Sequence, residues 1–151
     1  MKFVENEVVF SEIPNEITLA VNISNCPIRC KGCHSKHLWD DIGEELNEES
    51  IDTLIKSNNG ITCFCFMGGD RNPEEINILA KYIKEKYSRI KVGWYSGREY
   101  LASEVEKSNF DYIKLGRYIE ERGPINKETT NQRLYEIKDG QMIDITDKMF
   151  R

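Results

Sequence analysis

The chain has 151 residues, of which 39% are apolar, and this is enough material for one domain with a single core. Lys and Arg number 21 against 26 Asp and Glu, and the formal charge of −5 argues against a general affinity for nucleic acid or anionic membranes. The N-terminal residues lack the apolar segment of a secretion signal, and no stretch approaches the roughly 20 apolar residues of a membrane span. We therefore expect a cytoplasmic protein whose five cysteines are reduced thiols available for metal or redox chemistry.

Two strands are predicted first, over residues 3–10 and 16–23, with Ile13-Pro14-Asn15 as the turn between them. The second strand is almost continuously apolar and rich in β-branched residues, which is typical of a strand buried on both faces of a parallel sheet. A cysteine loop, Cys26-Pro27-Ile28-Arg29-Cys30-Lys31-Gly32-Cys33, follows at its carboxyl end. Loops at that edge of parallel α/β proteins build ligand sites.

Helices and strands then alternate as in βαβ units. The predicted elements are a helix from 47 to about 58, a strand at 61–67 before Gly68-Gly69-Asp70, a helix from Pro73, a strand at 90–95 before Ser96-Gly97, a short helix or turn at 101–107, a strand at 112–115, and a hairpin around Asp139-Gly140. The strands are too few for an eight-stranded barrel, which needs about 250 residues. We therefore predict a single α/β domain over residues 1–151, built as a partial, open β/α barrel with a mostly parallel sheet and a short C-terminal β-hairpin.

The cysteine loop has the spacing C-x3-C-x2-C. A structural zinc site made of sulfur ligands usually takes two C-x2-C pairs, a second pair is missing here, and a disulfide framework would leave an odd thiol. Iron–sulfur clusters normally take four cysteines, so three thiols indicate a cluster with one iron open to another ligand. A zinc site with His34 or His37 as fourth ligand, and a plain electron-carrier cluster, stay open as alternatives.

Two further strand ends carry candidate ligand-binding residues. At Gly68-Gly69-Asp70 the glycines allow a ligand close to the backbone, while Asp70 is suited to orient an ammonium group or to brace the loop. The hydroxyl of Ser96 is a candidate hydrogen-bond donor at the same edge.

Together these motifs resemble the radical S-adenosylmethionine (radical SAM) superfamily. Within it, Cys30-Lys31-Gly32-Cys33-His34, Met67-Gly68-Gly69-Asp70, Tyr95-Ser96-Gly97 and Thr130-Asn131-Gln132-Arg133 resemble the small activating proteins of anaerobic ribonucleoside-triphosphate reductases. The resemblance covers most of the chain and is looser between residues 98 and 128. A departure follows Gly116, where the family often has a proline and this chain has Arg117.

The resemblance implies that Cys26, Cys30 and Cys33 ligate three irons of a 4Fe–4S cluster and that SAM binds the fourth. It also implies that Gly68, Gly69 and Asp70 surround the amino group of SAM, with Ser96 near its carboxylate or ribose. The expected reaction is reductive cleavage of SAM, followed by removal of a hydrogen atom from a glycine of the reductase large subunit. This step needs no side-chain general base, and the expected electron donor is a flavodoxin-like protein.

Other readings of function remain beside this one: an activase of another glycyl radical enzyme, another small radical SAM enzyme, and a non-enzymatic electron-transfer module. Cys63 and Cys65 lie in an apolar strand, which predicts core packing instead of a second metal site. Trp39 follows the cysteine loop and is suited to shield a cluster from water or to cap the core. The sequence assigns no role to Arg117 or to Asn131-Gln132-Arg133.

Overall fold

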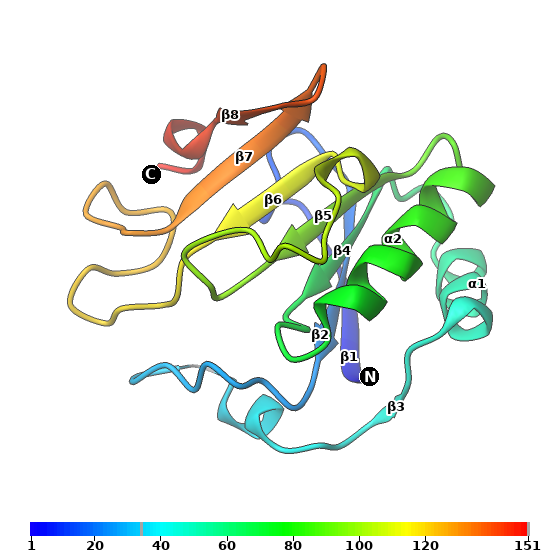
Figure 1. Ribbon diagram of the computed structural model, residues 1–151, viewed down its shortest axis with the longest axis horizontal. Helices are drawn as coiled ribbons and strands as arrows, with labels where there is room; N and C mark the ends of the chain where they lie inside the picture. The colour runs from blue at the N-terminus through cyan, green and yellow to red at the C-terminus, as the bar shows by residue number, and fades with distance from the viewer. Residues whose placement is uncertain (34, 151) are drawn as a thin grey trace.

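The computed structural model describes residues 1–33 and 35–150 (Figure 1). Its regular elements in this part of the chain are β1 (Lys2–Val9), β2 (Thr18–Ile23), η1 (Lys36–Trp39), β3 (Glu44–Glu45), α1 (Glu48–Ser57), β4 (Cys63–Met67), α2 (Pro73–Lys86), β5 (Lys91–Tyr95), η2 (Lys107–Asn109), β6 (Tyr112–Leu115), β7 (Arg133–Lys138), β8 (Gln141–Asp144) and η3 (Thr146–Met149), where η marks a 3-10 helix.

All eight strands form one sheet in the order β3-β1-β2-β4-β5-β6-β7-β8. The neighbours β2, β4, β5 and β6 run parallel to one another. On one flank β1 is antiparallel to both β2 and β3, and on the other β7 is antiparallel to both β6 and β8. A parallel centre is therefore bounded by antiparallel strands on both sides.

The predicted partial, open β/α barrel with a mostly parallel sheet is wrong. Four of the seven strand pairings are antiparallel, and the described residues form only two α-helices. The connection from β1 to β2 spans residues 10–17, which is too short for the crossover that parallel pairing requires, so the chain turns back on itself. The sheet is consequently mixed.

The expected C-terminal hairpin is confirmed as β7 and β8. Its two turn residues, Asp139 and Gly140, have φ angles of 51° and 75°. Positive φ at both central residues is the geometry of a type I′ turn, whose twist matches that of the flanking strands.

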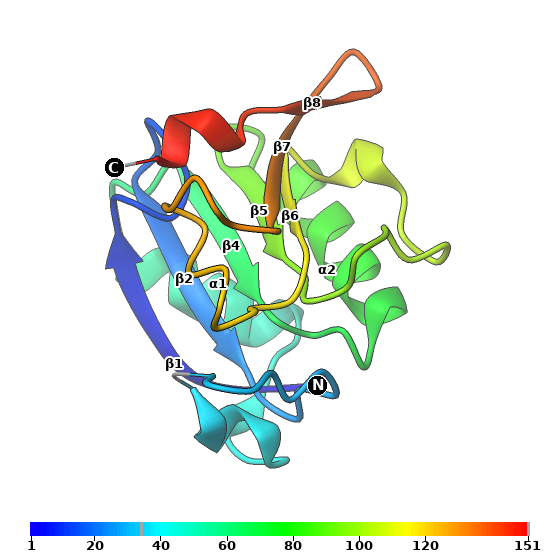
Figure 2. The same cartoon turned by 90° about the vertical axis from the view of Figure 1, so that its left-hand side faces the viewer.

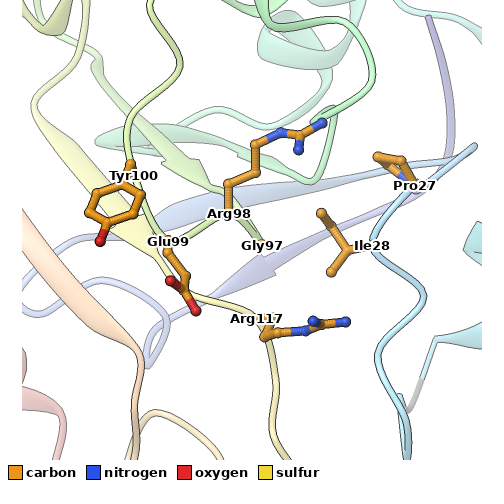
Figure 3. A pocket seen from close by; sticks show the side chains of 7 residues that line it. All are labelled: Pro27, Ile28, Gly97, Arg98, Glu99, Tyr100 and Arg117. Carbon is orange, nitrogen blue, oxygen red and sulfur yellow. The ribbon is translucent and has the colours of Figure 1, made fainter.

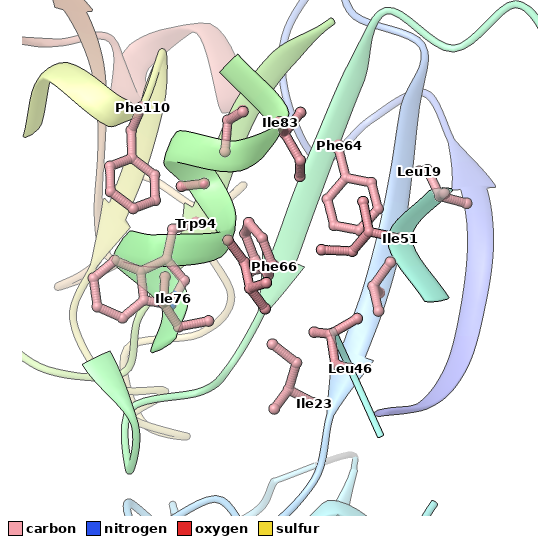
Figure 4. Close-up of a cluster of buried hydrophobic side chains, with 14 of the residues drawn as sticks. Leu19, Ile23, Leu46, Ile51, Phe64, Phe66, Ile76, Ile83, Trp94 and Phe110 are labelled. Carbon is pink, nitrogen blue, oxygen red and sulfur yellow. The ribbon is translucent and has the colours of Figure 1, made fainter. Parts of the chain in front are cut away.

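Helices α1 and α2 lie together on one side of the sheet (Figure 2) and enclose the larger core. Helix α1 begins at a reciprocal cap: Asn47 Oδ1 accepts from the backbone N–H of Ser50, and Ser50 Oγ accepts from the N–H of Asn47, each at 2.9 Å. Both helices turn apolar side chains toward the sheet, where they pack on Phe64, Phe66 and Trp94 (Figure 4). This packing holds the parallel strands in place.

A smaller core lies on the opposite face of the sheet. Cys63 and Cys65 point to that face because they alternate with Phe64 and Phe66, and both are fully buried. The segment before β2 and the C-terminal segment cover them, since Ile13 and Met149 belong to the same cluster. Nowhere in residues 1–33 and 35–150 is there a helix with the length and apolarity to cross a membrane.

Candidate functional site

The carboxyl ends of β2, β4 and β5 lie side by side because these strands are adjacent and parallel. The cysteine loop, residues 24–33, leaves β2, while Gly68 follows β4 and Ser96 follows β5. Hydrogen bonds join the strand exits: the Gly68 N–H donates to the carbonyl of Tyr95 at 3.0 Å, and the Ser96 N–H to that of Lys114 at 2.9 Å. The structure therefore brings the three predicted motifs to one edge.

The cysteine loop has no regular secondary structure, and its course depends on left-handed residues and backbone contacts. Asn25, Arg29 and Gly32 have φ angles of 60°, 51° and 76°. The N–H of Asn25 donates to the Asp40 carbonyl, and the N–H of Cys26 to the Leu38 carbonyl, both at 2.9 Å. The first half of the loop is thus tied to the segment that follows it.

Cys26, Cys30 and Cys33 are free thiols, with Cys30 buried and the other two partly buried. Within the described residues, no three His, Cys, Asp or Glu side chains are arranged as a site for a metal ion. The three thiols are nevertheless the donor type that iron–sulfur clusters take, and the Ser35 N–H donates to Cys33 Sγ at 3.4 Å, a kind of bond that also tunes such clusters. Metal sites commonly take their final arrangement only with the metal bound.

The indole of Trp39, beside this loop, has an N–H that lacks a hydrogen-bond acceptor among the described residues, as expected if a group that binds there is absent. Its Nε1–H is buried and has no hydrogen-bond partner in the described structure. An unpaired buried donor is unusual and indicates an absent partner. The ring lies beside the loop, with the guanidinium of Arg29 over it at 5.8 Å from its centroid.

His37 contributes less to the loop than the sequence allowed. His37 Nε2 lies 2.5 Å from Glu5 Oε1, so this ring nitrogen is engaged by a carboxylate from β1. His34, the other candidate for a fourth zinc ligand, lies outside the described residues. The zinc alternative gains no support from the contacts of His37.

The glycine pair is required by the local backbone and its packing. Gly68 and Gly69 have φ angles of 108° and 89°, which side-chain-bearing residues rarely adopt. A Cβ on Gly68 would lie 3.2 Å from the Ile23 carbonyl oxygen, and one on Gly69 would lie 2.6 Å from Cδ1 of Ile76. The pair therefore lets the chain pass closely over the end of β2 and the first turns of α2.

Asp70 connects the glycine turn to the end of β5. Its side chain is buried, Oδ1 accepts from the Ser96 hydroxyl at 2.5 Å, and Oδ2 accepts from the Gly97 N–H at 2.8 Å. The Asp70 carbonyl accepts from Arg98 Nη2 at 3.1 Å. The sequence allowed Asp70 either to orient an ammonium group or to brace the loop, and these contacts correspond to bracing. Ser96 contacts Asp70 directly.

Lys114 also belongs to this edge, and we did not predict it from the sequence. Its side chain is only 7% exposed, and Nζ donates to the carbonyls of Ser96 and Gly116, each at 2.9 Å. Burial lowers the pKa of this ammonium to about 8, while the charges of Asp70 and of Cys30 act in the opposite direction. The feature of the sequence that could have indicated a buried lysine is its position inside the apolar run Tyr112-Ile113-Lys114-Leu115.

A cavity of about 470 Å³ opens between the cysteine loop and the segments that follow β5 and β6 (Figure 3). Pro27 and Ile28 of the loop form one wall. The opposite wall is formed by residues 97–100 and by Arg117. The loop that carries the three thiols therefore lines part of the cavity. Two arginines also line it: Arg98, which follows β5, and Arg117, which follows β6.

The segment before β7 contacts the same region. Asn131 Nδ2 donates to the carbonyl of Arg117 at 3.0 Å, so Asn131 lies against the exit of β6. Gln132 is buried, whereas Arg133 reaches Asp144 on β8 at 3.9 Å. Of these three residues, Asn131 is therefore the one that supports the loop after Gly116.

Cys63 and Cys65 take no part in this edge. They pack in the smaller core as predicted, and burial raises the pKa of both thiols well above the usual range. They therefore stay protonated.

Comparison with known protein families gives a match. The family model described as 4Fe-4S single cluster domain matches residues 17–142, a range that includes the cysteine loop, the glycine turn and the strands of the parallel centre. Neither the curated proteins nor the solved structures gave a match. Because the family model spans most of its length, the chain belongs to the 4Fe-4S single cluster domain family.

Proposed function

We propose that this chain is a radical SAM activase that generates a glycyl radical on an anaerobic ribonucleoside-triphosphate reductase. The observation that carries the proposal is the meeting of three motifs at one sheet edge. The C-x3-C-x2-C loop, Gly68-Gly69-Asp70 and Ser96 leave three adjacent parallel strands, and Asp70 and Ser96 are joined by a hydrogen bond. A plain electron carrier has no need of the second and third motifs.

Under this proposal Cys26, Cys30 and Cys33 hold the cluster of the 4Fe-4S domain. Three cysteine ligands would leave one iron of the cluster for the amino and carboxylate groups of SAM. When bound, the cluster supplies one electron that splits SAM into methionine and a 5′-deoxyadenosyl radical. The Ser35 N–H already donates to Cys33 Sγ, and the unpaired Nε1–H of Trp39 is a further candidate donor to the cluster.

The Gly68 carbonyl accepts from Trp94 Nε1 and the Gly69 carbonyl from the Asn72 N–H, and each keeps a second lone pair that suits the ammonium group of SAM. The Asp70 carboxylate, fixed by Ser96 and Gly97, keeps the turn in place and adds negative charge near that ammonium. The cavity beside Ile28 provides volume for the remainder of SAM and for the approach of a substrate. A direct contact of Ser96 with SAM stays a prediction.

The substrate under this proposal is a protein glycine. The 5′-deoxyadenosyl radical takes one hydrogen atom from the glycine Cα, so 5′-deoxyadenosine forms and the unpaired electron stays on the glycine. A flavodoxin-like protein supplies the electron for each SAM cleaved. The segments 97–100 and 117–133 border the cavity and its neighbourhood and are the candidate contacts for the reductase large subunit.

The test uses anaerobically reconstituted full-length protein with dithionite and SAM. We expect 5′-deoxyadenosine from the wild type, and at least a hundredfold less from Cys26→Ala, Cys30→Ala and Cys33→Ala, each with reduced iron content. Cys63→Ala is the matched control, because this thiol packs in the smaller core, and it should keep both iron and activity. Wild-type protein with a full cluster and no SAM cleavage would refute the proposal.

The partner is tested separately by electron paramagnetic resonance (EPR) of the reductase subunit after the reaction. SAM cleavage without a glycyl radical in that subunit would remove the partner assignment and favour the activase of another glycyl radical enzyme, or another small radical SAM enzyme.

A non-enzymatic electron-transfer module is the second candidate, and the observation favouring it is that the family match specifies only a single 4Fe–4S cluster. For that module the EPR spectrum of the reduced cluster should be indifferent to SAM. For the activase, addition of SAM should change the spectrum as SAM occupies the open iron.

A further inference from the structure

Lys114 is a buried cation for which the described structure contains no paired anion. It is the only buried lysine or arginine among residues 1–33 and 35–150, and its ammonium forms no ion pair there. Its partners are the carbonyl oxygens of Ser96 and Gly116 and the ring of Tyr95, whose centroid lies 5.4 Å from Nζ, and none of them is an anion. A buried ammonium without a counter-charge is strongly unfavourable, so such groups are normally paired or lose their proton.

The position of Lys114 indicates where the missing anion belongs. The carbonyl that Nζ contacts is that of Ser96, and the next residue, Gly97, packs against Ile28 of the cysteine loop, with only 3.0 Å between a Cβ built on Gly97 and Ile28 Cγ1. Two consecutive residues, Ser96 and Gly97, therefore lie between Nζ and the loop. Thiolate charge at Cys30 or Cys26 would favour the protonated form of this ammonium and raise its pKa.

Asp70 is an acid at the same edge, and its buried carboxylate favours the charged form of Lys114, but its oxygens bond the Ser96 hydroxyl and the Gly97 N–H and form no ion pair with Lys114 in the described part of the chain. Cys65 stays protonated, because burial raises the pKa of its thiol well above the usual range. Cys26 and Cys30 remain, and a thiol becomes a lasting anion when it ligates a metal.

We propose that Lys114 is the fixed counter-cation of the iron–sulfur cluster, placed to stabilise the cluster and above all its reduced state. The proposal rests on the ligation of the cluster by Cys26 and Cys30. Reduction adds one negative charge to the cluster, so a nearby buried cation stabilises the reduced form more than the oxidised form and raises the reduction potential. Two carbonyl contacts hold the ammonium in place while the charge changes.

The test is an EPR-monitored redox titration of the reconstituted full-length protein in the absence of SAM. Lys114→Met removes the charge and keeps most of the side-chain length. Lys114→Gln removes the charge and keeps two N–H donors for the carbonyls of Ser96 and Gly116, which protects the fold. Lys91→Met is the matched control, because Lys91 lies at the opposite end of β5 and pairs with Glu16 at 3.0 Å.

We expect both Lys114 variants to have more negative midpoint potentials than the wild type, and Lys91→Met to match the wild type. Wild-type potentials in Lys114→Gln at full iron content would overturn the proposal and leave Lys114 as a tie between β5 and β6. An unchanged potential with at least tenfold weaker SAM binding would also overturn it, because Lys114 would then face SAM. Since SAM is absent from the titration, a cluster that fails to cleave SAM would refute the activase and leave this result intact.

Discussion

Replacing Gly69 by alanine tests whether the glycine turn is required by the protein's own packing. The φ angle of 89° costs an alanine about 1–2 kcal/mol. The new Cβ would lie 2.6 Å from Cδ1 and 2.9 Å from Cγ1 of Ile76, and 3.3 Å from Cδ1 of Ile23. Both isoleucines are buried in the larger core, so neither can move away freely, and overpacking costs about 1–3 kcal/mol more. We expect Gly69→Ala to lose about 2–5 kcal/mol in all.

Gly60 provides a matched control, because its φ angle is 92° and nothing lies within 4 Å of a Cβ built there. Gly60→Ala should therefore lose only the backbone contribution, about 1–2 kcal/mol. The measurement is urea unfolding followed by tryptophan fluorescence, with the free energy of unfolding compared among the three proteins. Equal losses in the two variants would show that Ile76 accommodates the methyl group, and the packing argument for this glycine would fail.

Two further predictions concern buried and partly buried carboxylates. A double-mutant cycle with Asp70→Ala and Ser96→Ala should give a coupling free energy of about 1.5–3 kcal/mol in the same unfolding assay, as for a hydrogen bond to a charged group, and additive losses would contradict the observed contact. Hydrogen bonds from Tyr87 and Lys86 lower the pKa of Asp52 from 3.8 to about 2. Because the folded pKa is depressed, this stabilisation is present above about pH 4 and is lost as the pH falls through 2. Asp52→Asn should therefore show a shallower loss of stability over that pH range in acid titrations of unfolding, and an unchanged slope would count against these contacts.

The positions of the strands were largely predictable from the sequence, whereas their directions were not. The predicted strand at 112–115 coincides with β6, and that at 61–67 contains β4, because continuous apolar runs mark buried strands locally. Direction depends on the connections. The short turn at Ile13-Pro14-Asn15 favours an antiparallel return, whereas the buried composition of residues 16–23 favours a parallel centre, and β2 meets both conditions because it is antiparallel to β1 and parallel to β4.

The residues of the candidate site were likewise predictable only where they are close together in the sequence. Cys26, Cys30 and Cys33 lie within one stretch of eight residues, so their spacing is visible in the sequence. The contact between Asp70 and Ser96 spans 26 residues and exists only because β4 and β5 are neighbours. Lys114 was missed because a lysine in a short strand is normally expected to face solvent, and only the fold shows its ammonium enclosed by two strand exits.

The mixed sheet also bears on the order in which the protein folds. Strands β1 and β2 pair over sequence separations of 9–20 residues, whereas the parallel pair of β2 and β4 begins with Thr18 and Cys63, 45 residues apart. Local pairs close with less loss of chain entropy, so the antiparallel hairpin of β1 and β2 is expected to form before the parallel pair of β2 and β4. The N–H of Ser24 donates to the Lys2 carbonyl at 3.0 Å, which attaches the start of the cysteine loop to that early hairpin. Asp70 and Lys114 join it only after the crossovers are complete, so the two halves of the site are assembled at different stages of folding.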